Sequence, residues 1–466
     1  MKTTTILNSW LPEYSHRLDC KPYVGGSLAT KVLLESLPLR KDKLRTLTAG
    51  FDGGIYNGPK FSRTYVDSPD HGVPFVGCSS MLYADLSDLP LLSRKQAESN
   101  FLRHLELKRG MSLISCTGTI GRMAYSRPDM EGMWSSQHIL KVVPDPNKIP
   151  SGYLYAYLSS KFGVPLVVSG TCGSIIQWLG PQHIADLPVP RLGDALEHEI
   201  HTLVEQAAEL RTKASKEFHE LLEEFENFAG LPTSKTLRNQ VFPISTVAQS
   251  AQLSGRLDVN FHGPRHHHML RPYTEKQIQP MTVAALATSV VEPTRFKRIE
   301  HDDPRHSAPL YGTGDIGNVD PEPISWITAF PGHESYAAGE RSVLIPRSGQ
   351  LNGIIGTATF PIGGVRTGVV SEHAIRIFCR SEEDAGYAFL ALRSYTGYLQ
   401  LKARAFGGSI PTLDVTNVAA VLIPELELGD RKRFGEQAYQ AAVLRTEAIK
   451  KEKSARDLVE KAIEQS

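Results

Sequence analysis

One glycine-rich stretch has the spacing of a nucleotide-binding turn. Gly312–Gly317 (GTGDIG) matches the GxGxxG pattern, which cradles a dinucleotide when a strand precedes it and a helix follows it. The next residues include Pro321 and Pro323, which cannot continue a helix. We therefore expect a turn here. A nucleotide-binding enzyme that uses this segment stays as an alternative, and nucleotide protection against thermal unfolding would support it.

Two further clusters carry groups that bind metals or move protons in other proteins. His266, His267 and His268 are adjacent, with His262 nearby, but three neighbouring histidines on a regular element cannot all face one ion. We expect a polar loop here rather than a metal site. The carboxylates from Glu220 to Glu226 are expected on the solvated outer face of a helix.

Catalytic signatures are missing from the sequence. It contains no GxxxxGK[ST] phosphate loop, no GxSxG elbow, no HExxH zinc motif and no Asn-Pro-Pro-Tyr-like tetrad to hold a flipped base. We predict a protein with no catalysis, no metal and no cofactor of its own.

Loops that suit DNA recognition occur at matching places in the two halves. Thr117–Arg122 and Arg347–Gly353 each follow a short apolar stretch and contain glycines, so the backbone can approach a ligand closely. Arg can bond guanine bidentately, and Gln or Asn can do so with adenine. The alternative for each loop is a plain polar turn. The candidate DNA-binding residues are Thr117, Thr119, Arg122, Ser136, Gln137, His138, Ser174, Arg347, Ser348, Gln350, Asn352, Arg366, Thr367, His373 and Ser409.

The matching places belong to an internal duplication. Gln206–Thr212 (QAAELRT) returns as Gln440–Thr446 (QAAVLRT), 234 positions later (440 − 206). Ser136-Gln137-His138 returns as Ser371-Glu372-His373 at 235. A collinear series of such pairs predicts two copies of one globular unit.

Each copy ends in a segment with helical periodicity. Leu196–Phe228 has apolar residues every three or four positions and no Pro or Gly, which predicts a helix of roughly 50 Å. Its counterpart near the C-terminus has the same register, so we expect the two to pair as an antiparallel coiled coil. The expected seam is Ile200, Leu203, Ala207, Leu210, Phe218, Leu221, Phe225, Phe434, Ala441, Leu444, Ala448 and Val459.

These patterns predict an α+β fold with two tandem mixed α/β domains, each followed by a long helix. The expected bounds are 1–193 and 231–428 for the domains and 194–230 and 429–466 for the helices, with Asp194 and Asp430 as caps. Strands are expected at Met111–Ser115, His138–Val143, Ile184–Pro190, Arg341–Ile345, His373–Phe378 and Val418–Pro424.

Composition sets the broad class. The chain has 466 residues, 41% of them hydrophobic and 22% charged, with a net charge of +1. No run of eighteen apolar residues or secretory h-region occurs, and the five cysteines form no CxxC pair. We expect a cytoplasmic protein with reduced thiols that is not in a membrane. Any surface that binds DNA must concentrate its basic residues locally.

Taken in order, these segments resemble the specificity subunits of type I restriction–modification systems. The resemblance rests on Arg17–Asp19 and Arg256–Asp258, on Leu113–Gly121, on Gly152–Leu158 and on the run from Gly173 to Pro190 before the long helix, a pattern that returns in the second half. Where the family has Glu-Gln at the start of that helix, this chain has Glu197-His198-Glu199 and Lys432-Arg433-Phe434.

The resemblance implies two target-recognition domains held apart by two paired helices. It also implies DNA methyltransferase subunits docked on those helices, sometimes with a motor-nuclease subunit, in a complex that acts in phage defence. S-adenosylmethionine would then bind the partner methyltransferase. We expect an adaptor that reads an asymmetric bipartite site on double-stranded DNA and directs methylation to it. The other alternative is a coiled-coil scaffold that binds only protein.

Overall fold

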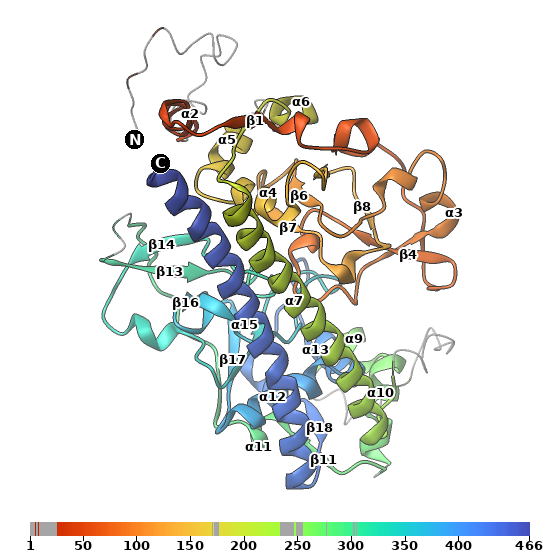
Figure 1. Cartoon of the computed structure of the whole chain (residues 1–466). Coiled ribbons are helices and arrows are strands. Elements are labelled where there is room, and N and C mark those ends of the chain that lie inside the picture. Colours follow the sequence, from red (N-terminus) through yellow and green to blue (C-terminus); the bar gives the residue numbers. More distant parts are fainter. Residues whose placement is uncertain are drawn as a thin grey trace. The chain divides into compact units, whose positions relative to one another are not determined.

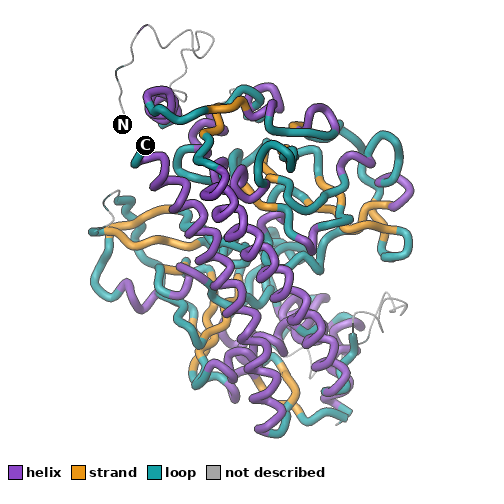
Figure 2. The backbone as a smooth tube through the Cα atoms, in the orientation of Figure 1, coloured by secondary structure: helices purple, strands orange, loops and turns teal. Residues whose placement is uncertain are grey.

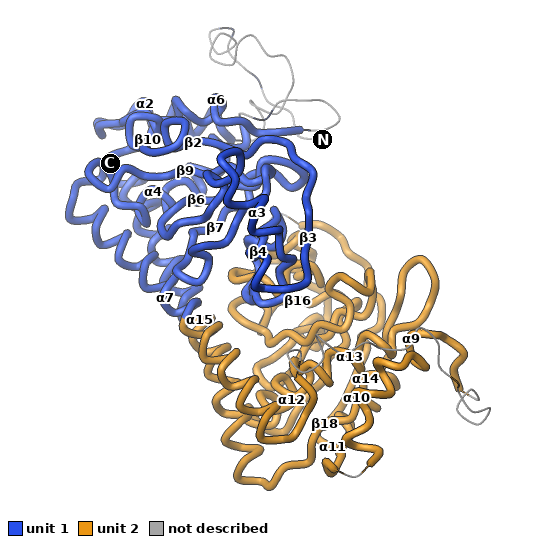
Figure 3. The backbone as a smooth tube through the Cα atoms, turned by 90° about the vertical axis from the view of Figure 1, so that its right-hand side faces the viewer, with its two compact units in different colours: residues 1–212, 447–466 blue, residues 213–446 orange. Residues whose placement is uncertain are grey.

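The structure is a computed structural model that describes Thr5, Asn8 and residues 26–169, 171, 177–233, 247, 255–275, 277–301, 303 and 305–466. It divides into two compact units (Figure 3). Unit 1 comprises residues 1–212 and 447–466, and unit 2 comprises residues 213–446. Arg17–Asp19 and Gly173–Ile175, which contribute to the family resemblance, lie outside the described residues.

Unit 1 contains three small sheets (Figure 1). Their orders are β1-β10, β2-β9-β6-β7 and β3-β5-β4-β8, all antiparallel except for the parallel pair β4·β8. The strands are β1 (Lys41–Lys43), β2 (Ile55–Tyr56), β3 (Tyr65–Val66), β4 (Gly72–Val76), β5 (Leu91–Ser93), β6 (Ser112–Ser115), β7 (Met123–Tyr125), β8 (Trp134–Ser135), β9 (Ile139–Val142) and β10 (Pro188–Pro190).

Unit 2 repeats this arrangement with fewer strands. Its sheets are β11-β18, β12-β17-β15 and β14-β13-β16, again with one parallel pair, β13·β16. The strands are β11 (Pro280–Thr282), β12 (Ser289–Val291), β13 (Ser307–Tyr311), β14 (Ser325–Thr328), β15 (Ser342–Pro346), β16 (Val369–Val370), β17 (Ala374–Phe378) and β18 (Leu422–Pro424).

Short helices cover these sheets, and Figure 2 shows helices and strands interspersed along both units. Those of unit 1 are α2 (Ser27–Ser36), α3 (Arg94–Ala97), α4 (Ser151–Leu158), α5 (Gly163–Ser169) and α6 (Pro181–Ile184). Those of unit 2 are α9 (Val259–His262), α10 (Pro264–Thr274), α11 (Val283–Leu286), α12 (Glu382–Arg393), α13 (Tyr395–Arg404) and α14 (Val415–Ala419). The predicted mixed α+β class is confirmed.

Equivalent strands of the two units are separated by the same number of residues as the repeated sequence motifs. β4 and β13 differ by 235 positions, as do β8 and β16, and both pairs form a parallel ladder within their own unit. The repeated sequence therefore encodes a repeated sheet topology.

Two long helices, α7 (Asp194–Phe228) and α15 (Leu428–Glu464), contribute residues to both units. The expected caps are wrong. The Glu197 amide donates to the Gly193 carbonyl at 3.0 Å, so Gly193 caps α7. Asp430 is already the third residue of α15, where its charge favours the positive helix N-terminus.

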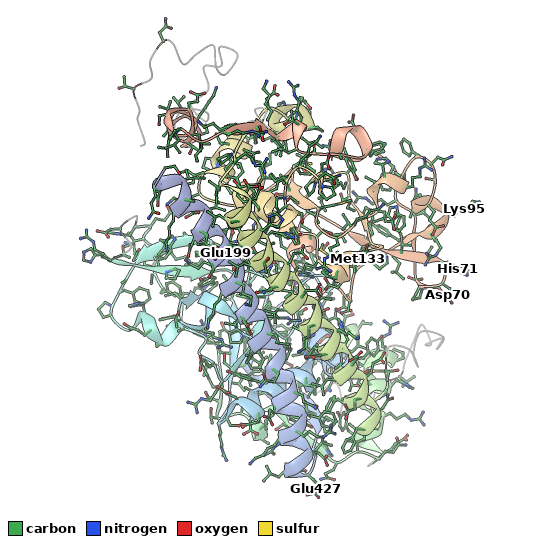
Figure 4. The ribbon with its side chains drawn as sticks, viewed as in Figure 1. Asp70, His71, Lys95, Met133, Glu199 and Glu427 are labelled. Atoms are coloured by element: carbon green, nitrogen blue, oxygen red, sulfur yellow. The ribbon has the colours of Figure 1, made fainter. Side chains whose placement is uncertain are left out.

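The twelve predicted seam residues belong to α7 and α15. Three of them, Leu203, Leu210 and Leu444, are only half-buried, and the other nine are buried. Val204, Ala208 and Ile463, which the predicted seam did not include, are also buried, in a hydrophobic core of unit 1. Glu199 is exposed on α7 (Figure 4).

In each unit, a glycine of a short helix packs directly against the backbone of a long helix. In unit 1, a Cβ on Gly152 of α4 would lie 2.8 Å from the His201 carbonyl of α7. In unit 2, a Cβ on Gly386 of α12 would lie 2.0 Å from the Gly435 carbonyl of α15. Only glycine permits this approach.

In each unit, the long helix that does not make the glycine contact makes a hydrogen bond instead. In unit 1, Glu460 of α15 accepts a hydrogen bond from the Lys161 amide at 2.8 Å. In unit 2, Glu226 of α7 accepts one from the Tyr395 amide at 2.7 Å. Donors and acceptors are each 234 positions apart. The same bond thus forms twice, with α7 and α15 exchanging roles.

Within unit 1 the long helices share a buried ion cluster. Glu452 of α15 pairs with Arg211 of α7, and also accepts bonds from Arg456 at 2.8 Å and from the Tyr155 hydroxyl at 2.9 Å. Burial alone would raise the pKa of Glu452, but the two arginines outweigh it and lower that pKa to about 2. In unit 2 the equivalent positions hold Phe218 and Phe389, whose ring centroids are 5.0 Å apart.

Several local predictions need correction. Ile184 ends helix α6 and Val418 belongs to α14, so only Pro188–Pro190 and Leu422–Pro424 of those predicted strands are extended. Pro181 at the first turn of α6 and Asp414 as the cap of α14, accepting from the Asn417 amide, start helices that a search for alternation overlooks.

Glu226 is not on a solvated face. It is 6% exposed, and burial raises its pKa to about 6. The carboxylate run therefore includes one residue that packs inward to hold the start of α13.

Gly435→Ala should destabilise the protein by about 1–3 kcal/mol or more, because the new Cβ would lie 2.0 Å from the Glu383 carbonyl. Gly429→Ala is the matched control in the same helix, since nothing lies within 4 Å of its added Cβ. It should be neutral or add up to about 1 kcal/mol through helix propensity. Chemical denaturation measures both, and equal effects would contradict the close packing of α12 on α15.

Glu226→Gln should remove a pH dependence. With its pKa raised from 4.5 to about 6, the folded state binds a proton more tightly than the unfolded state, so stability is lost as pH rises through that window. At pH 7 the variant should be more stable than the wild type by about 2 kcal/mol at most. Melting curves from pH 4 to pH 8 measure this, with the exposed Glu220→Gln as control; parallel curves for all three proteins would disprove it.

Candidate nucleic-acid interface

The first candidate loop of unit 1 leaves the buried strand β6 and is braced by that strand's last residue. The Ser115 hydroxyl donates to the Thr119 carbonyl at 2.6 Å and accepts from the Arg122 amide at 3.0 Å. Gly118 and Gly121 have positive φ, so the chain turns sharply here. The result is a short loop with Thr119 exposed at its tip and Thr117 and Arg122 half-buried at its ends.

The equivalent loop of unit 2 leaves β15. Its first residue, Arg347, forms an ion pair with Glu292. Gln350 and Asn352 are exposed further along, and the Gln350 amide donates to the Ser409 carbonyl at 3.5 Å. This contact brings Ser348, Gln350 and Ser409 into one region, since Ser348 also forms a β-bridge with Thr412.

A Ser-X-His turn packs beneath each loop. In unit 1 the Cys116 amide donates to the His138 carbonyl at 3.0 Å, and the His138 amide donates to the Ser136 hydroxyl at 3.1 Å. In unit 2 the Arg347 amide donates to the His373 carbonyl at 2.9 Å, and the His373 amide donates to the Ser371 hydroxyl at 3.3 Å. The structure therefore joins the loops and turns that the sequence treated as separate candidates.

A third segment completes each cluster, and the sequence reading missed it. In unit 1 it runs from residue 57 to 63, where Arg63 donates to Gln137 at 3.0 Å. In unit 2 it runs from 292 to 298, where Arg298 donates to Glu372 at 2.6 Å. The signal was present, because Lys60-Phe61-Ser62-Arg63 and Arg295-Phe296-Lys297-Arg298 are 235 positions apart.

Charge shapes the protonation of both clusters. Burial lowers the pKa of His138, and the charge of Arg63 lowers it further. Burial would raise the pKa of Glu372, but the hydrogen bond and charge of Arg298 outweigh it and hold that pKa below its ordinary range. At neutral pH unit 1 therefore presents a neutral His138 beside Arg63, and unit 2 presents an ionised Glu372 beside Arg298.

The remaining candidates are less closely associated. Arg366 lies at the end of the 3-10 helix Gly363–Arg366, where it donates to the Pro361 carbonyl and pairs with Glu340. Thr367 follows it and is exposed. Ser174 lies outside the described residues. Whether any of the candidates contacts DNA stays a prediction.

A buried cation lies under each cluster. Lys141 in β9 and Arg376 in β17 are both fully buried and lie 235 positions apart. Lys141 donates to the Ile139 carbonyl at 3.1 Å, and Arg376 donates to the Ala374 and Val370 carbonyls. Burial lowers the pKa of Lys141 to about 7 and that of Arg376 to about 10. The strand that follows each Ser-X-His turn therefore holds a buried basic side chain that donates to backbone carbonyls.

The glycine-rich motif does not form a dinucleotide cradle. Residues 307–328 are all described, and the chain passes from β13 through turns to β14 without a helix. Added Cβ atoms at Gly314 and Gly317 would meet nothing within 4 Å, so neither position requires glycine for close packing. The condition set for the nucleotide-binding alternative is not met.

The histidine-rich segment is a helix, so the expected loop is wrong. His266 lies in α10 with 4% exposure, where its Nδ1 is 2.6 Å from the Phe261 carbonyl and burial lowers its pKa to about 4. Among the described residues, no group of three or more His, Cys, Asp or Glu side chains could hold a metal ion. In that same part of the chain, no helix has the length and apolar character to cross a membrane.

Comparison with solved structures finds neighbours from type I restriction–modification systems. No protein-family model and no curated protein matches the chain. A type I restriction–modification S subunit from M. genitalium matches with TM-score 0.37 and 12% identity, over 92% of this chain and 96% of that one. The HsdS subunit from Thermoanaerobacter tengcongensis matches with TM-score 0.28 and 14% identity, over 92% and 97%. A chain from a type I R-M system described for complex assembly and conformational transition has TM-score 0.27 and 14% identity, over 92% and 98%. The family named from the sequence is thus the family of these neighbours.

Lys141→Met should stabilise the protein at neutral pH. Because burial lowers the folded-state pKa from 10.5 to about 7, stability is lost as pH falls from 10.5 towards 7. The uncharged variant should lack this slope. Denaturation between pH 7 and pH 10 measures it, and the exposed Lys95→Met, on α3 in unit 1 (Figure 4), is the control. A wild-type slope retained by the Lys141 variant would refute this account of the buried cation.

Proposed function

We propose that this chain is the DNA-recognition subunit of a type I restriction–modification system. It reads an asymmetric bipartite site on double-stranded DNA and directs methyltransferase subunits to it, in some assemblies with a motor-nuclease subunit. S-adenosylmethionine belongs to the methyltransferase, and this chain performs no catalysis. The proposal draws on the motifs that resemble the family, on their duplication and on the clusters of loops in units 1 and 2.

The observation that carries the proposal is the exchange of roles between α7 and α15. Each unit has a close glycine contact with one long helix and a carboxylate contact with the other, at positions 234 apart. Two copies of one unit that share two helices in this way are expected to be related by a pseudo-two-fold axis. We infer that α7 and α15 pair antiparallel along their length, as an antiparallel coiled coil.

Local contacts support the antiparallel sense. In unit 1 Lys451 donates to Gln206 at 2.9 Å, and in unit 2 Arg433 donates to Glu224 at 2.7 Å. Residue numbers rise along α7 as they fall along α15. Two-fold related units would present their loops to DNA in opposite senses, as symmetric dimers do with their half-sites.

The site is expected to be asymmetric because the clusters differ chemically. The pair Asn57–Cys116 in unit 1 corresponds to the ion pair Glu292–Arg347 in unit 2. Each unit would thus read its own half-site, and the helices would set the unread spacer. A helix of roughly 50 Å spans about fifteen base pairs at most, and fewer once the units tilt.

Methylation mapping tests this proposal. Cells that carry the chain with its neighbouring methyltransferase should gain methylation at one bipartite sequence, and cells without the chain should not. Binding of the purified complex to that sequence should weaken steeply as salt rises. Methylation without sequence preference, or unchanged when the chain is deleted, would remove the proposal.

A second experiment tests the role of the helices as a spacer. Inserting seven residues of matched heptad pattern after Thr212 in α7 and after Thr446 in α15 adds about 10 Å to each helix. The preferred spacer should lengthen by about three base pairs while both half-sites stay the same. An unchanged spacer would contradict this role, and a seven-residue substitution at the same places is the control.

A further inference from the structure

An arginine is held in the same way in the two clusters. Arg63 lies 74 residues before Gln137 and donates to its Oε1 at 3.0 Å. Arg298 lies 74 residues before Glu372 and donates to its Oε2 at 2.6 Å. In both cases Nη2 makes the bond, and the residue that receives it is the middle one of a Ser-X-His turn. Nη2 of Arg298 also donates to the Ser371 hydroxyl at 3.2 Å.

The accepting residues are themselves fixed. The Gln137 amide is 3.2 Å from Nε2 of His138, and a Glu372 oxygen is 3.7 Å from Nε2 of His373. The turns beneath are held by backbone bonds to the buried Ser136 and Ser371. Arg63 and Arg298 are therefore anchored at one end of the guanidinium group.

Aromatic rings restrain the arginines further. The guanidinium carbon of Arg63 lies 5.3 Å from the centroid of the Phe75 ring, and that of Arg298 lies 5.7 Å from the Phe296 ring. Such contacts favour a fixed position for a planar cation and cost little side-chain freedom on binding.

Each arginine is more exposed than the residue that accepts its hydrogen bond, as expected if the arginine contacts a base and the acceptor supports it. Arg63 is exposed and Gln137 is half-buried, while the side chain of Arg298 is 37% exposed against 9% for Glu372. A guanidinium group has five N–H donors in a planar fork. Nη2 of Arg63 makes one bond to its support, and Nη2 of Arg298 makes two, to Glu372 and Ser371. The N–H groups that are not engaged in this way are the donors that remain for a ligand.

Guanine is the base that matches such a fork. Its O6 and N7 accept two parallel bonds in the major groove, and Arg is the side chain that most often makes them. Basic neighbours favour the approach of DNA, since Lys60 in unit 1 and Arg295 and Lys297 in unit 2 are also exposed. The supports are thus positioning residues, and the arginines contact the base.

We propose that Arg63 and Arg298 each read a guanine, one in each half-site, and that Gln137 and Glu372 position them. This inference rests on the proposed function and adds to it the identity of one reading residue and one base in each half-site. None of these roles requires the side chain of Arg347, which is only 21% exposed and paired with Glu292.

Conservative substitution tests the proposal. The full chain is purified with its methyltransferase subunits, and binding is measured to duplexes in which every base pair of the wild-type site is varied in turn. Arg63→Lys should lose about ten- to hundredfold of the discrimination for G·C at one position of one half-site, and leave the other half-site unchanged. Arg298→Lys should do the same in the other half-site.

Two further variants separate the roles. Gln137→Glu keeps an acceptor for Arg63 and should preserve the G·C preference, whereas a change in the base read would assign the reading to residue 137 and overturn the proposal. Arg305→Lys is the control, because its side chain is 82% exposed and pairs with Asp303. It should leave discrimination unchanged at every position.

The failures are distinguishable. If the wild-type complex shows no bipartite preference, the proposed function is wrong. If it shows one, and Arg63→Lys and Arg298→Lys weaken binding to all sequences equally, the arginines contact phosphates and only this inference fails. Unchanged discrimination in both variants would also overturn it. Thermal melting of each variant confirms that it is folded, and the two units provide independent instances.

Discussion

The structure depends on backbone-to-backbone packing between a short helix and a long one. At Gly152 in unit 1 and Gly386 in unit 2, no Cβ fits between α4 and α7 or between α12 and α15. An interface without side chains has little freedom to slide or rotate. A carboxylate of the second long helix adds a hydrogen bond in each unit, accepted by Glu460 from the Lys161 amide in unit 1 and by Glu226 from the Tyr395 amide in unit 2.

The duplicated scaffold keeps its backbone contacts and varies its chemistry. The amide-to-carbonyl bond that joins loop to Ser-X-His turn is the same in both units. Three positions around it are neutral in unit 1, Asn57, Cys116 and Gln137, and their counterparts in unit 2 are the charged Glu292, Arg347 and Glu372. Side chains at these positions can therefore differ between the units without loss of the shared backbone contacts.

Much of the fold could be predicted because it rests on local patterns. The periodic helices, the strands β6, β9, β15 and β17 and the constant offset are all visible in the sequence. What could not be predicted depends on partners distant in the chain. The charge of Lys141 and Arg376 gives no sign that both side chains are buried and donate to backbone carbonyls. Glu226 belongs to a charged run, and only its bond to Tyr395 explains its burial.

The candidate site was predicted in part for the same reason. The glycines in Thr117–Arg122 and Arg347–Gly353 marked these segments as candidate loops. The segments that contain Arg63 and Arg298 have no comparable glycine pattern. Their role emerges only when the partners 74 residues away are known. Repeats compared at a fixed offset would have revealed them, since Phe61 and Arg63 match Phe296 and Arg298.

The central claim is that one chain presents two copies of a reading unit in opposite senses. It is tested most directly by making the copies identical. Residues 280–424 are replaced by residues 41–190, whose ends pair in the equivalent two-stranded sheets, with Tyr155 of the second copy changed to Phe to match its new contact with Phe218. Methylation mapping should then give an inverted repeat of the first half-site with the original spacer. A direct repeat, or a site that retains the second half-site, would contradict the account.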